Sequence, residues 1–396
     1  MSTHPKNQKV GFLLGAGVSL PCGAPTTVRL TEQLTQQEMP YVRGDDGRYR
    51  LQRNYDAAAT ATGVPQIHDV QRLLHHLRQC VDAYYSDRVN PVACPQRTVN
   101  YEDLAYLCVQ VLETLNRNRD NPAVGPFVHD LANELKITED ALYDTAREAL
   151  NLISDHLLAH LSNLSPAPGH IACLRDACTA LGPGAVPVLS LNYDCLIEQA
   201  LQEARIPVND MLRVETDGRR ILDVALQPDQ VNLCKLHGSI NWYRWRPVPR
   251  RPRHDRWDRW IGALSEERMR EAWNCDDRPV TLIGRFNKEL DYAGAPFTEL
   301  FAAARSALRD LPVLVVSGYS FGDKAVNTMI VDWIYAAPKG RRRIVVAHAE
   351  PHSLREGSRD AMGNKWEGWT DAGVLIEMPK FLSNLSWDEL RDRIEE

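Results

Sequence analysis

The sequence predicts an α/β protein in which a doubly wound parallel sheet is interrupted by a large helical insertion. Short buried strands alternate with helix-length amphipathic segments, as in sheets whose crossover connections are helices. From about residue 65 to 162 the apolar period instead becomes helical throughout. We therefore expect a Rossmann-like domain formed by residues 1–30 and 170–396, with a helical subdomain at 31–169.

The first expected strand is Val10–Leu14, an apolar run that enters a glycine turn, as buried parallel strands often do. In the insertion, apolar residues at helical spacing predict helices at 67–84, 104–115 and 142–161. Beyond it we expect helices at 170–181, 194–205, 296–310 and 323–336, and strands at 186–191, 231–236, 313–317 and 343–347.

Composition limits the classes of function. The 396 residues include 46 basic and 52 acidic ones, a net charge of −6, so no global field attracts the chain to nucleic acid or membranes. The polar first ten residues lack the apolar stretch of a signal peptide, and the aliphatic runs are too short to cross a bilayer. Nine cysteines without a Cys-x-x-Cys pair indicate reduced thiols, so we expect a cytoplasmic protein without a membrane segment.

Gly15-Ala-Gly-Val-Ser19 follows the first predicted strand. A strand that ends in Gly-x-Gly lets backbone N–H groups approach a pyrophosphate, and the next helix N-terminus adds partial positive charge. The third glycine of the dinucleotide fingerprint is missing. A plain strand-to-helix turn explains this motif alone equally well.

Leu191-Asn-Tyr-Asp-Cys195 lies where a buried strand passes into a helix. Asn192 and Asp194 are thus expected at the carboxyl edge of the sheet, where open α/β sheets bind ligands. Helix capping would account for one of these two polar residues but not for both.

Two further turns follow strands. Lys235-Leu-His-Gly-Ser239 places His237 just past a strand, a suitable position for a general base. Val316-Ser-Gly-Tyr-Ser-Phe-Gly-Asp323 supplies small residues with N–H and O–H donors, although a strand-to-helix turn capped by Asp323 is the structural alternative.

In this order, the Gly-Ala-Gly-x-Ser, Asn-x-Asp, His-Gly and Gly-x-Ser turns resemble the sirtuin superfamily. The Lys-Leu-His-Gly-Ser and Gly-Tyr-Ser-Phe-x-Asp forms are similar to the sirtuin-like domains of bacterial anti-phage defence systems rather than to the protein deacylases. The resemblance covers residues 9–30 and 186–350. In the insertion only Tyr101-Glu-Asp-Leu104 is weakly similar, to an acidic helix start in these proteins. Among these proteins the chain most resembles the stand-alone subunit paired with a HerA-type hexameric ATPase.

The resemblance implies an NAD⁺ glycohydrolase that forms nicotinamide and ADP-ribose. Asn192 would position the nicotinamide ribose and the attacking water, Asp194 would support it, and His237 would be the general base. The glycine turns would hold the phosphates, through Gly15, Ala16, Gly17 and Ser19, and the adenosine side, through Gly318 and Ser320. Cleavage of this glycosidic bond has an oxocarbenium-like transition state, which needs a hydrogen-bonded ribose and a base rather than a metal.

The chain departs from the deacylases in two ways. It lacks the two Cys-x-x-Cys pairs of their structural zinc, and Cys173 and Cys178 are poorly spaced for a shared tetrahedral ion. It also has His348-Ala-Glu350 where they place Asn-x-Glu to hold the adenine ribose. His156 and His160 have metal-ligand spacing but lack the Glu of a His-Glu-x-x-His motif, so we expect no metal.

The segment from Trp242 to Trp260 is the only strongly basic and aromatic one. Arginines interleaved with tryptophans can hold single-stranded nucleic acid through phosphates and stacked bases. A proline-rich excursion that packs on the domain or on a neighbouring subunit is the favoured interpretation, because flanking acids dilute the charge.

Three functions remain open at this point. The first is an NAD⁺ glycohydrolase that depletes cellular NAD⁺ after a partner or phage trigger. The second is an NAD-dependent protein deacylase, and the third is a catalytically silent nucleotide-binding subunit of a defence complex. Because a complete site must be gated and no sensor domain is visible, we expect a homo-oligomer that assembles with a HerA-type ATPase.

Overall fold

The computed structural model describes residues 9–36, 41–51, 67–86, 98–116, 122–216, 220–247, 260–263, 273–275, 278–283, 292, 294, 296–338, 340–358 and 361–396. The chain forms two compact units. The sheet unit consists of Met1–Ala24, Leu164–Leu282 and Asn287–Glu396, and the insertion unit consists of Pro25–Asn163 and Ile283–Phe286.

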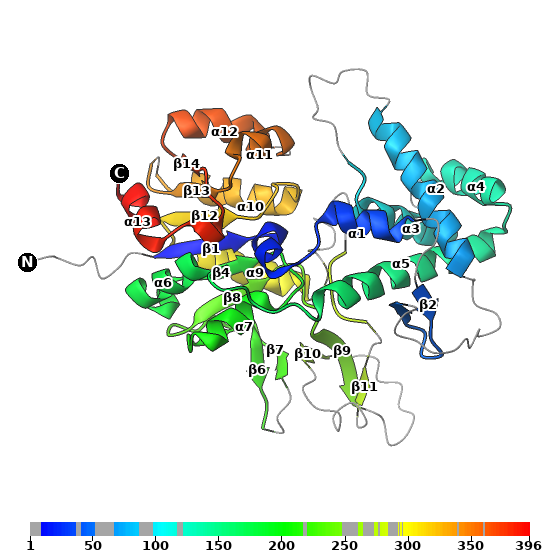
Figure 1. Cartoon of the computed structure of the whole chain (residues 1–396), viewed down its shortest axis with the longest axis horizontal. Coiled ribbons are helices and arrows are strands. Elements are labelled where there is room, and N and C mark those ends of the chain that lie inside the picture. Colours follow the sequence, from blue (N-terminus) through cyan, green and yellow to red (C-terminus); the bar gives the residue numbers. More distant parts are fainter. Residues whose placement is uncertain are drawn as a thin grey trace, which may run out of the picture. The chain divides into compact units, whose positions relative to one another are not determined.

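A seven-stranded parallel sheet forms the centre of the sheet unit, in the order β14-β13-β12-β1-β4-β8-β5 (Figure 1). Its strands are β1 (Val10–Leu14), β4 (Val188–Ser190), β5 (Val208–Asn209), β8 (Val231–Lys235), β12 (Val313–Ser317), β13 (Arg343–Ala347) and β14 (Leu375–Met378). After β1 the chain adds β4, β5 and β8 on one side and then β12, β13 and β14 on the other, so the topological switch point lies beside β1. The predicted Rossmann-like, doubly wound sheet is confirmed.

Helices cover both faces of this sheet. One face packs against α6 (Ala172–Leu181), α7 (Leu196–Glu203) and α13 (Trp387–Glu395), and the other against α9 (Phe297–Leu308), α10 (Lys324–Tyr335) and α12 (Ala361–Asp371). Neighbouring strand residues alternate between the two cores: Phe12 joins the first and Leu13 the second. Burial on both faces explains why most strand positions are apolar, with polar exceptions such as Asn232 and Lys235 of β8.

Shorter elements join the strands and helices of the sheet unit. They are the 3₁₀ turns η1 (Ala16–Cys22), η3 (Pro183–Ala185) and η5 (Leu382–Asn384), and the helix α11 (Pro351–Gly357).

A five-stranded antiparallel sheet, in the order β11-β9-β10-β7-β6, was not predicted. Its strands are β6 (Leu212–Val214), β7 (Arg220–Leu222), β9 (Trp242–Pro247), β10 (Trp260–Ala263) and β11 (Trp273–Cys275). The segment interpreted as a proline-rich excursion therefore begins and ends as paired strands, with Trp242 opposite Ala263. Residues 248–259 lie outside the described residues. Trp242 is buried in the core, as a period-two strand pattern allows.

The insertion unit contains the helices α1 (Thr27–Leu34), α2 (Ile67–Ser86), α3 (Tyr101–Leu115), α4 (Val124–Leu135) and α5 (Glu139–Leu161). Its predicted helices appear as α2, α3 and α5. Asn100 and Asp103 form a capping box at the start of α3, and the Thr138 side chain caps α5. The resemblance links the start of α3 to a family feature, and this capping box is a sufficient structural reason for Asp103.

The insertion unit also holds an unpredicted hairpin, β2 (Tyr41–Arg43) and β3 (Tyr49–Leu51), which docks on α5 through buried polar groups. The backbone N–H of Tyr49 donates to Asp155 Oδ2 at 2.8 Å, and the Tyr49 hydroxyl donates to Glu148 Oε2 at 2.9 Å. Tyr41 hydrogen-bonds Nδ1 of His156, whose ring lies 4.5 Å from the ring of His160. The histidine pair thus belongs to a buried network that holds the hairpin.

Among the described residues, none of the helices is both long and apolar enough to cross a membrane. No group of three or more His, Cys, Asp or Glu side chains within the described ranges is arranged to hold a metal ion.

Candidate active site

The carboxyl ends of β1, β4, β8 and β12 lie side by side, because these strands are neighbours in one parallel sheet. Backbone pairing continues past the strand ends. Leu191 N–H donates to the Leu14 carbonyl and Leu236 N–H to the Ser190 carbonyl, both at 2.9 Å. The turns that follow these strands are therefore brought to one edge of the sheet.

The two glycine turns pack directly against each other. Gly17 N–H donates to the Gly318 carbonyl at 2.9 Å. A Cβ on Gly15 would lie 2.5 Å from the Gly318 carbonyl oxygen, and one on Gly17 would lie 2.7 Å from the Gly318 Cα. Gly318 itself has a φ of +66°, a left-handed conformation that favours glycine. Contact between the turns therefore requires these glycines whether or not a ligand binds there.

The element after the first turn differs from the expected helix. Residues Ala16–Cys22 form the 3₁₀ turn η1, and the first α-helix begins only at Thr27. A short 3₁₀ turn has poorer hydrogen-bond geometry than an α-helix, so its N-terminus attracts a phosphate less strongly than the helix that the sequence predicted. Ala16 and Ser320 are exposed beside the paired turns.

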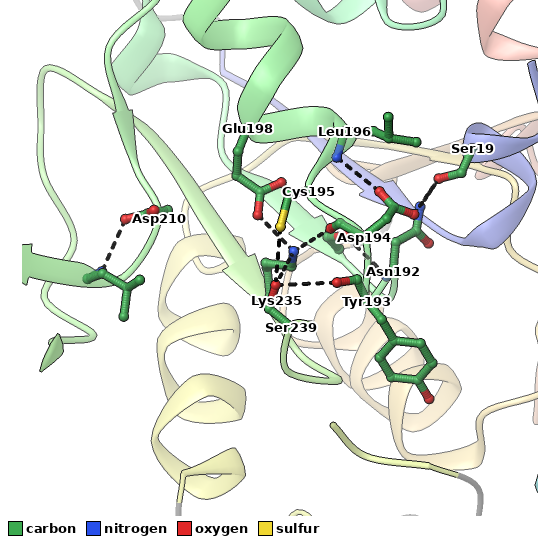
Figure 2. Close-up of polar contacts among 12 residues, drawn as sticks. Ser19, Asn192, Tyr193, Asp194, Cys195, Leu196, Glu198, Asp210, Lys235 and Ser239 are labelled. Atoms are coloured by element: carbon green, nitrogen blue, oxygen red, sulfur yellow. Dashed lines mark hydrogen bonds and ion pairs between the residues drawn. The ribbon is translucent and has the colours of Figure 1, made fainter. Parts of the chain in front are cut away.

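Ser19, Asn192 and Asp194 form one buried network (Figure 2). Asn192 Nδ2 donates to Ser19 Oγ at 3.0 Å, and Ser19 Oγ donates to Asp194 Oδ2 at 2.7 Å. Asp194 Oδ1 accepts from the N–H of Leu196 at the start of α7. Asp194 thus holds both Ser19 and the first residue of α7. Asn192 is 3% exposed, and its Oδ1 is buried without a hydrogen-bond partner among the described residues.

His237 lies in the turn after β8 and is 5% exposed. Its Nε2 is 3.2 Å from Asp323 Oδ2. The ring centroids of Tyr193 and Tyr292 lie 6.2 and 6.3 Å from that of the imidazole. A carboxylate beside one ring nitrogen can orient the ring, as in the dyads that support general bases.

Asp323 combines two functions, of which the sequence indicated only one. Oδ1 accepts from the N–H groups of Ala325 and Val326 and so caps α10, while Oδ2 is 3.2 Å from both His237 Nε2 and the Tyr292 hydroxyl. His237 and Asp323 are 86 residues apart in the chain, so no local sequence pattern could indicate their contact.

A cavity of about 130 Å³ lies beside the glycine turns. It is lined by Gly17, Val18, Leu20 and Pro21 of η1, by His170 and Ser317, and by Phe381, Leu382 and Ser383 around η5. Burial lowers the pKa of His170, and its Nδ1 donates to the Ala167 carbonyl at 3.1 Å. The His348 ring packs edge-on against Phe381 at 5.3 Å, so the His348-Ala-Glu350 segment borders a residue of this cavity.

Comparison with known proteins gives one family match. Residues 187–367 match the model of the SIR2-like domain family. A Sir2 homologue solved as an NAD complex aligns over 98% of this chain and 91% of its own, with 13% identity and a TM-score of 0.38. Sir2Tm bound to a propionylated peptide aligns over 98% and 92%, with 10% identity and a TM-score of 0.35. With identities and TM-scores this low, these two structures support no conclusion beyond the sheet topology described above.

A search of curated proteins gave no match. The matched segment contains Asn192, Asp194, His237, Gly318 and Ser320, whereas Gly15, Ala16, Gly17 and Ser19 precede it. The structure brings both groups to the same edge of the sheet. Over residues 187–367, which hold most of the candidate site, the chain is therefore similar to SIR2-like domains.

Proposed function

We propose that this protein is an NAD⁺ glycohydrolase, which converts NAD⁺ and water to nicotinamide, ADP-ribose and a proton. The observation that carries the proposal is the buried amide of Asn192. Its Nδ2 donates to Ser19, which is held in turn by Asp194, and its Oδ1 has no partner within the described structure. Leaving such a group unsatisfied costs about 1–3 kcal/mol, a cost that a bound O–H donor would remove.

In this proposal Asn192 Oδ1 accepts a hydrogen bond from the attacking water or from a ribose hydroxyl. As the glycosidic C–N bond breaks, its electron pair leaves with nicotinamide, and the water oxygen bonds to the ribose carbon. His237 accepts the proton, and Asp323 stabilises the imidazole in the required orientation. Asp194 holds Ser19, so Asn192 need not reorganise during the reaction.

NAD⁺ as the substrate class is supported by three observations. The chain resembles sirtuin-like proteins in its ordered turns, it matches the SIR2-like domain family, and its glycine turns lie at the switch point of the sheet. We assign the phosphates to the first turn, from Gly15 to Ser19. The adenosine side is assigned to Gly318, Ser320 and the adjoining cavity, whose lining is mostly apolar, as expected for a planar base.

Nicotinamide release by the purified chain, measured alone and with the HerA-type ATPase, tests the proposal. Asn192→Ala and His237→Ala should each lower the rate about 10²-fold or more, because each removes a group that acts in the transition state. Asn133→Ala on α4 and His352→Ala on α11, both exposed, are matched controls and should keep the wild-type rate. Unchanged release in both site variants would remove these residues from the mechanism.

The same assay separates the alternatives. A deacylase would release nicotinamide only when an acylated peptide is present. A silent regulatory subunit would bind NAD⁺ without releasing nicotinamide under any condition. Hydrolysis without peptide is the result that the proposal predicts.

We further propose that the protein acts in the bacterial cytoplasm as a homo-oligomer paired with a HerA-type ATPase in anti-phage defence. This part rests on the resemblance described above. Light scattering at micromolar concentration should give a mass well above the 44.7 kDa of one chain. A mass of one chain that does not change when the HerA-type ATPase is added would contradict this proposal.

A further inference from the structure

Lys235, the last residue of β8, is a buried cation at the candidate site, only 1% exposed. Its ammonium group has three N–H donors and finds three acceptors. It donates to Glu198 Oε1 at 2.7 Å, to Ser239 Oγ at 2.8 Å and to the Asp194 carbonyl (Figure 2). No donor of this lysine is left unused.

These acceptors belong to two different segments. Asp194 lies in the loop after β4, which also contains Asn192, and Glu198 lies in α7, which follows this loop. Ser239 lies in the turn after β8, two residues beyond His237. Lys235 therefore connects the segment of the candidate amide with the turn of the candidate base.

Other contacts join the same two segments. Ile240 N–H donates to the Tyr193 carbonyl at 2.9 Å, and Ser239 Oγ donates to the same carbonyl at 3.3 Å. Cys195 Sγ lies 3.7 Å from Ser239 Oγ. Lys235 is the charged group in this contact, and its ammonium donates to Ser239 as well as to Glu198 and the Asp194 carbonyl.

Burial of an ammonium group is unfavourable, because its removal from water costs free energy even after relaxation of the protein. Burial is the largest single effect and disfavours the charged form of Lys235, but Glu198, Cys195 and Asp194 together outweigh it, so the pKa of Lys235 lies above its usual value. The lysine is therefore charged at neutral pH. An apolar pair of similar size would often be as stable, so stability alone does not account for a charged pair here.

We propose that Lys235 is a positioning residue that fixes the turn carrying His237 against the segment carrying Asn192. Because the separation of the two candidate groups depends on both segments, loss of the ammonium lets the turns shift. A misplacement of about 1 Å can lower a rate about 10²-fold. The catalytic consequence rests on the proposed function, whereas the connection between the two turns does not.

The test uses a variant in which both charges are removed together. Lys235→Met/Glu198→Leu leaves no unpaired charge, so we expect it to fold. Amide exchange at Ile240 and Leu196 should become at least tenfold faster, while exchange at Leu191, inside the sheet pairing, stays the same. With NAD⁺, kcat should fall about 10²-fold and KM should be unchanged. The matched control is Arg305→Met/Asp332→Leu, an exposed ion pair between α9 and α10 at 2.6 Å.

Each outcome is decisive. Unchanged exchange at Ile240 and Leu196 overturns the proposal, and so does faster exchange with wild-type kcat. Faster exchange in a protein whose wild type releases no nicotinamide, either alone or with the HerA-type ATPase, supports the connection by Lys235 and contradicts the proposed function. If the double variant does not fold, Ser239→Ala replaces it, since it removes one acceptor and keeps the ion pair. Faster exchange at Ile240 then supports the proposal, and unchanged exchange overturns it.

Discussion

The pH dependence of stability should show the buried state of His156 in the insertion unit. Burial, with repulsion from His160 added, lowers the pKa of His156 to about 3. The ring is fully buried and hydrogen-bonded to Tyr41, so the folded protein keeps it neutral. In the unfolded chain the ring takes up a proton near its ordinary pKa of about 6.5.

The sign follows from proton uptake. Between about pH 6.5 and pH 3 the unfolded state binds more protons at this site than the folded state, so stability falls as the pH falls. At pH 5, about 1.5 units below the unfolded pKa, the loss is about 2 kcal/mol. The variant His156→Gln removes the titrating group and should lose about 2 kcal/mol less than wild type between pH 7 and pH 5.

Urea unfolding at the two pH values measures this difference. Far-UV circular dichroism reports the helices of both units, whereas fluorescence of the nine tryptophans reports the sheet unit alone, because the first of them is Trp242. His75→Gln, at an exposed position of α2, is the control and should behave as wild type. Equal losses in wild type and His156→Gln would refute the reasoning about the buried ring.

Three other predictions concern the sheet unit. Gly318→Ala should lower the melting temperature far more than Gly373→Ala. The two glycines have similar φ values, +66° and +65°. The added Cβ would lie 2.4 Å from a backbone atom at Gly318, whereas nothing lies within 4 Å of it at Gly373. Equal shifts would show that the packed glycine turns are misassigned. Asp323→Asn should lower kcat for NAD⁺ cleavage about 10-fold to 100-fold, because the orienting carboxylate of His237 is lost; steady-state kinetics with an unchanged kcat would argue against the pair. Chelator treatment should leave melting temperature and cleavage intact, and stoichiometric zinc in elemental analysis would show the cysteines to be misinterpreted.

The sheet was predictable because its strands are predominantly apolar runs that are followed by glycine or polar turns. Val313–Ser317 and Arg343–Ala347 have the predicted bounds, while the strand expected at 186–191 is shorter, Val188–Ser190. The antiparallel sheet was missed because its strands are short and lie among charged and proline-containing segments. Its pairing is set by long-range contacts that local sequence does not encode.

The candidate site was predictable where one residue follows one strand. Asn192, Asp194 and His237 follow β4 and β8, and parallel topology brings such turns to one edge. The contacts of Asp323 and Lys235 were not predictable, because each joins segments that are distant in the chain. Capping and burial alone would have explained either residue.

The most direct measurement follows NAD⁺ turnover by the full chain in isotope-labelled water, with nicotinamide and ADP-ribose quantified together. We predict one nicotinamide for each ADP-ribose, with one oxygen from water on the released ribose carbon, and loss of both products in Asn192→Ala. The proposed activity would be contradicted if wild type and Asn192→Ala released nicotinamide equally, or if wild type released none either alone or with its partner ATPase.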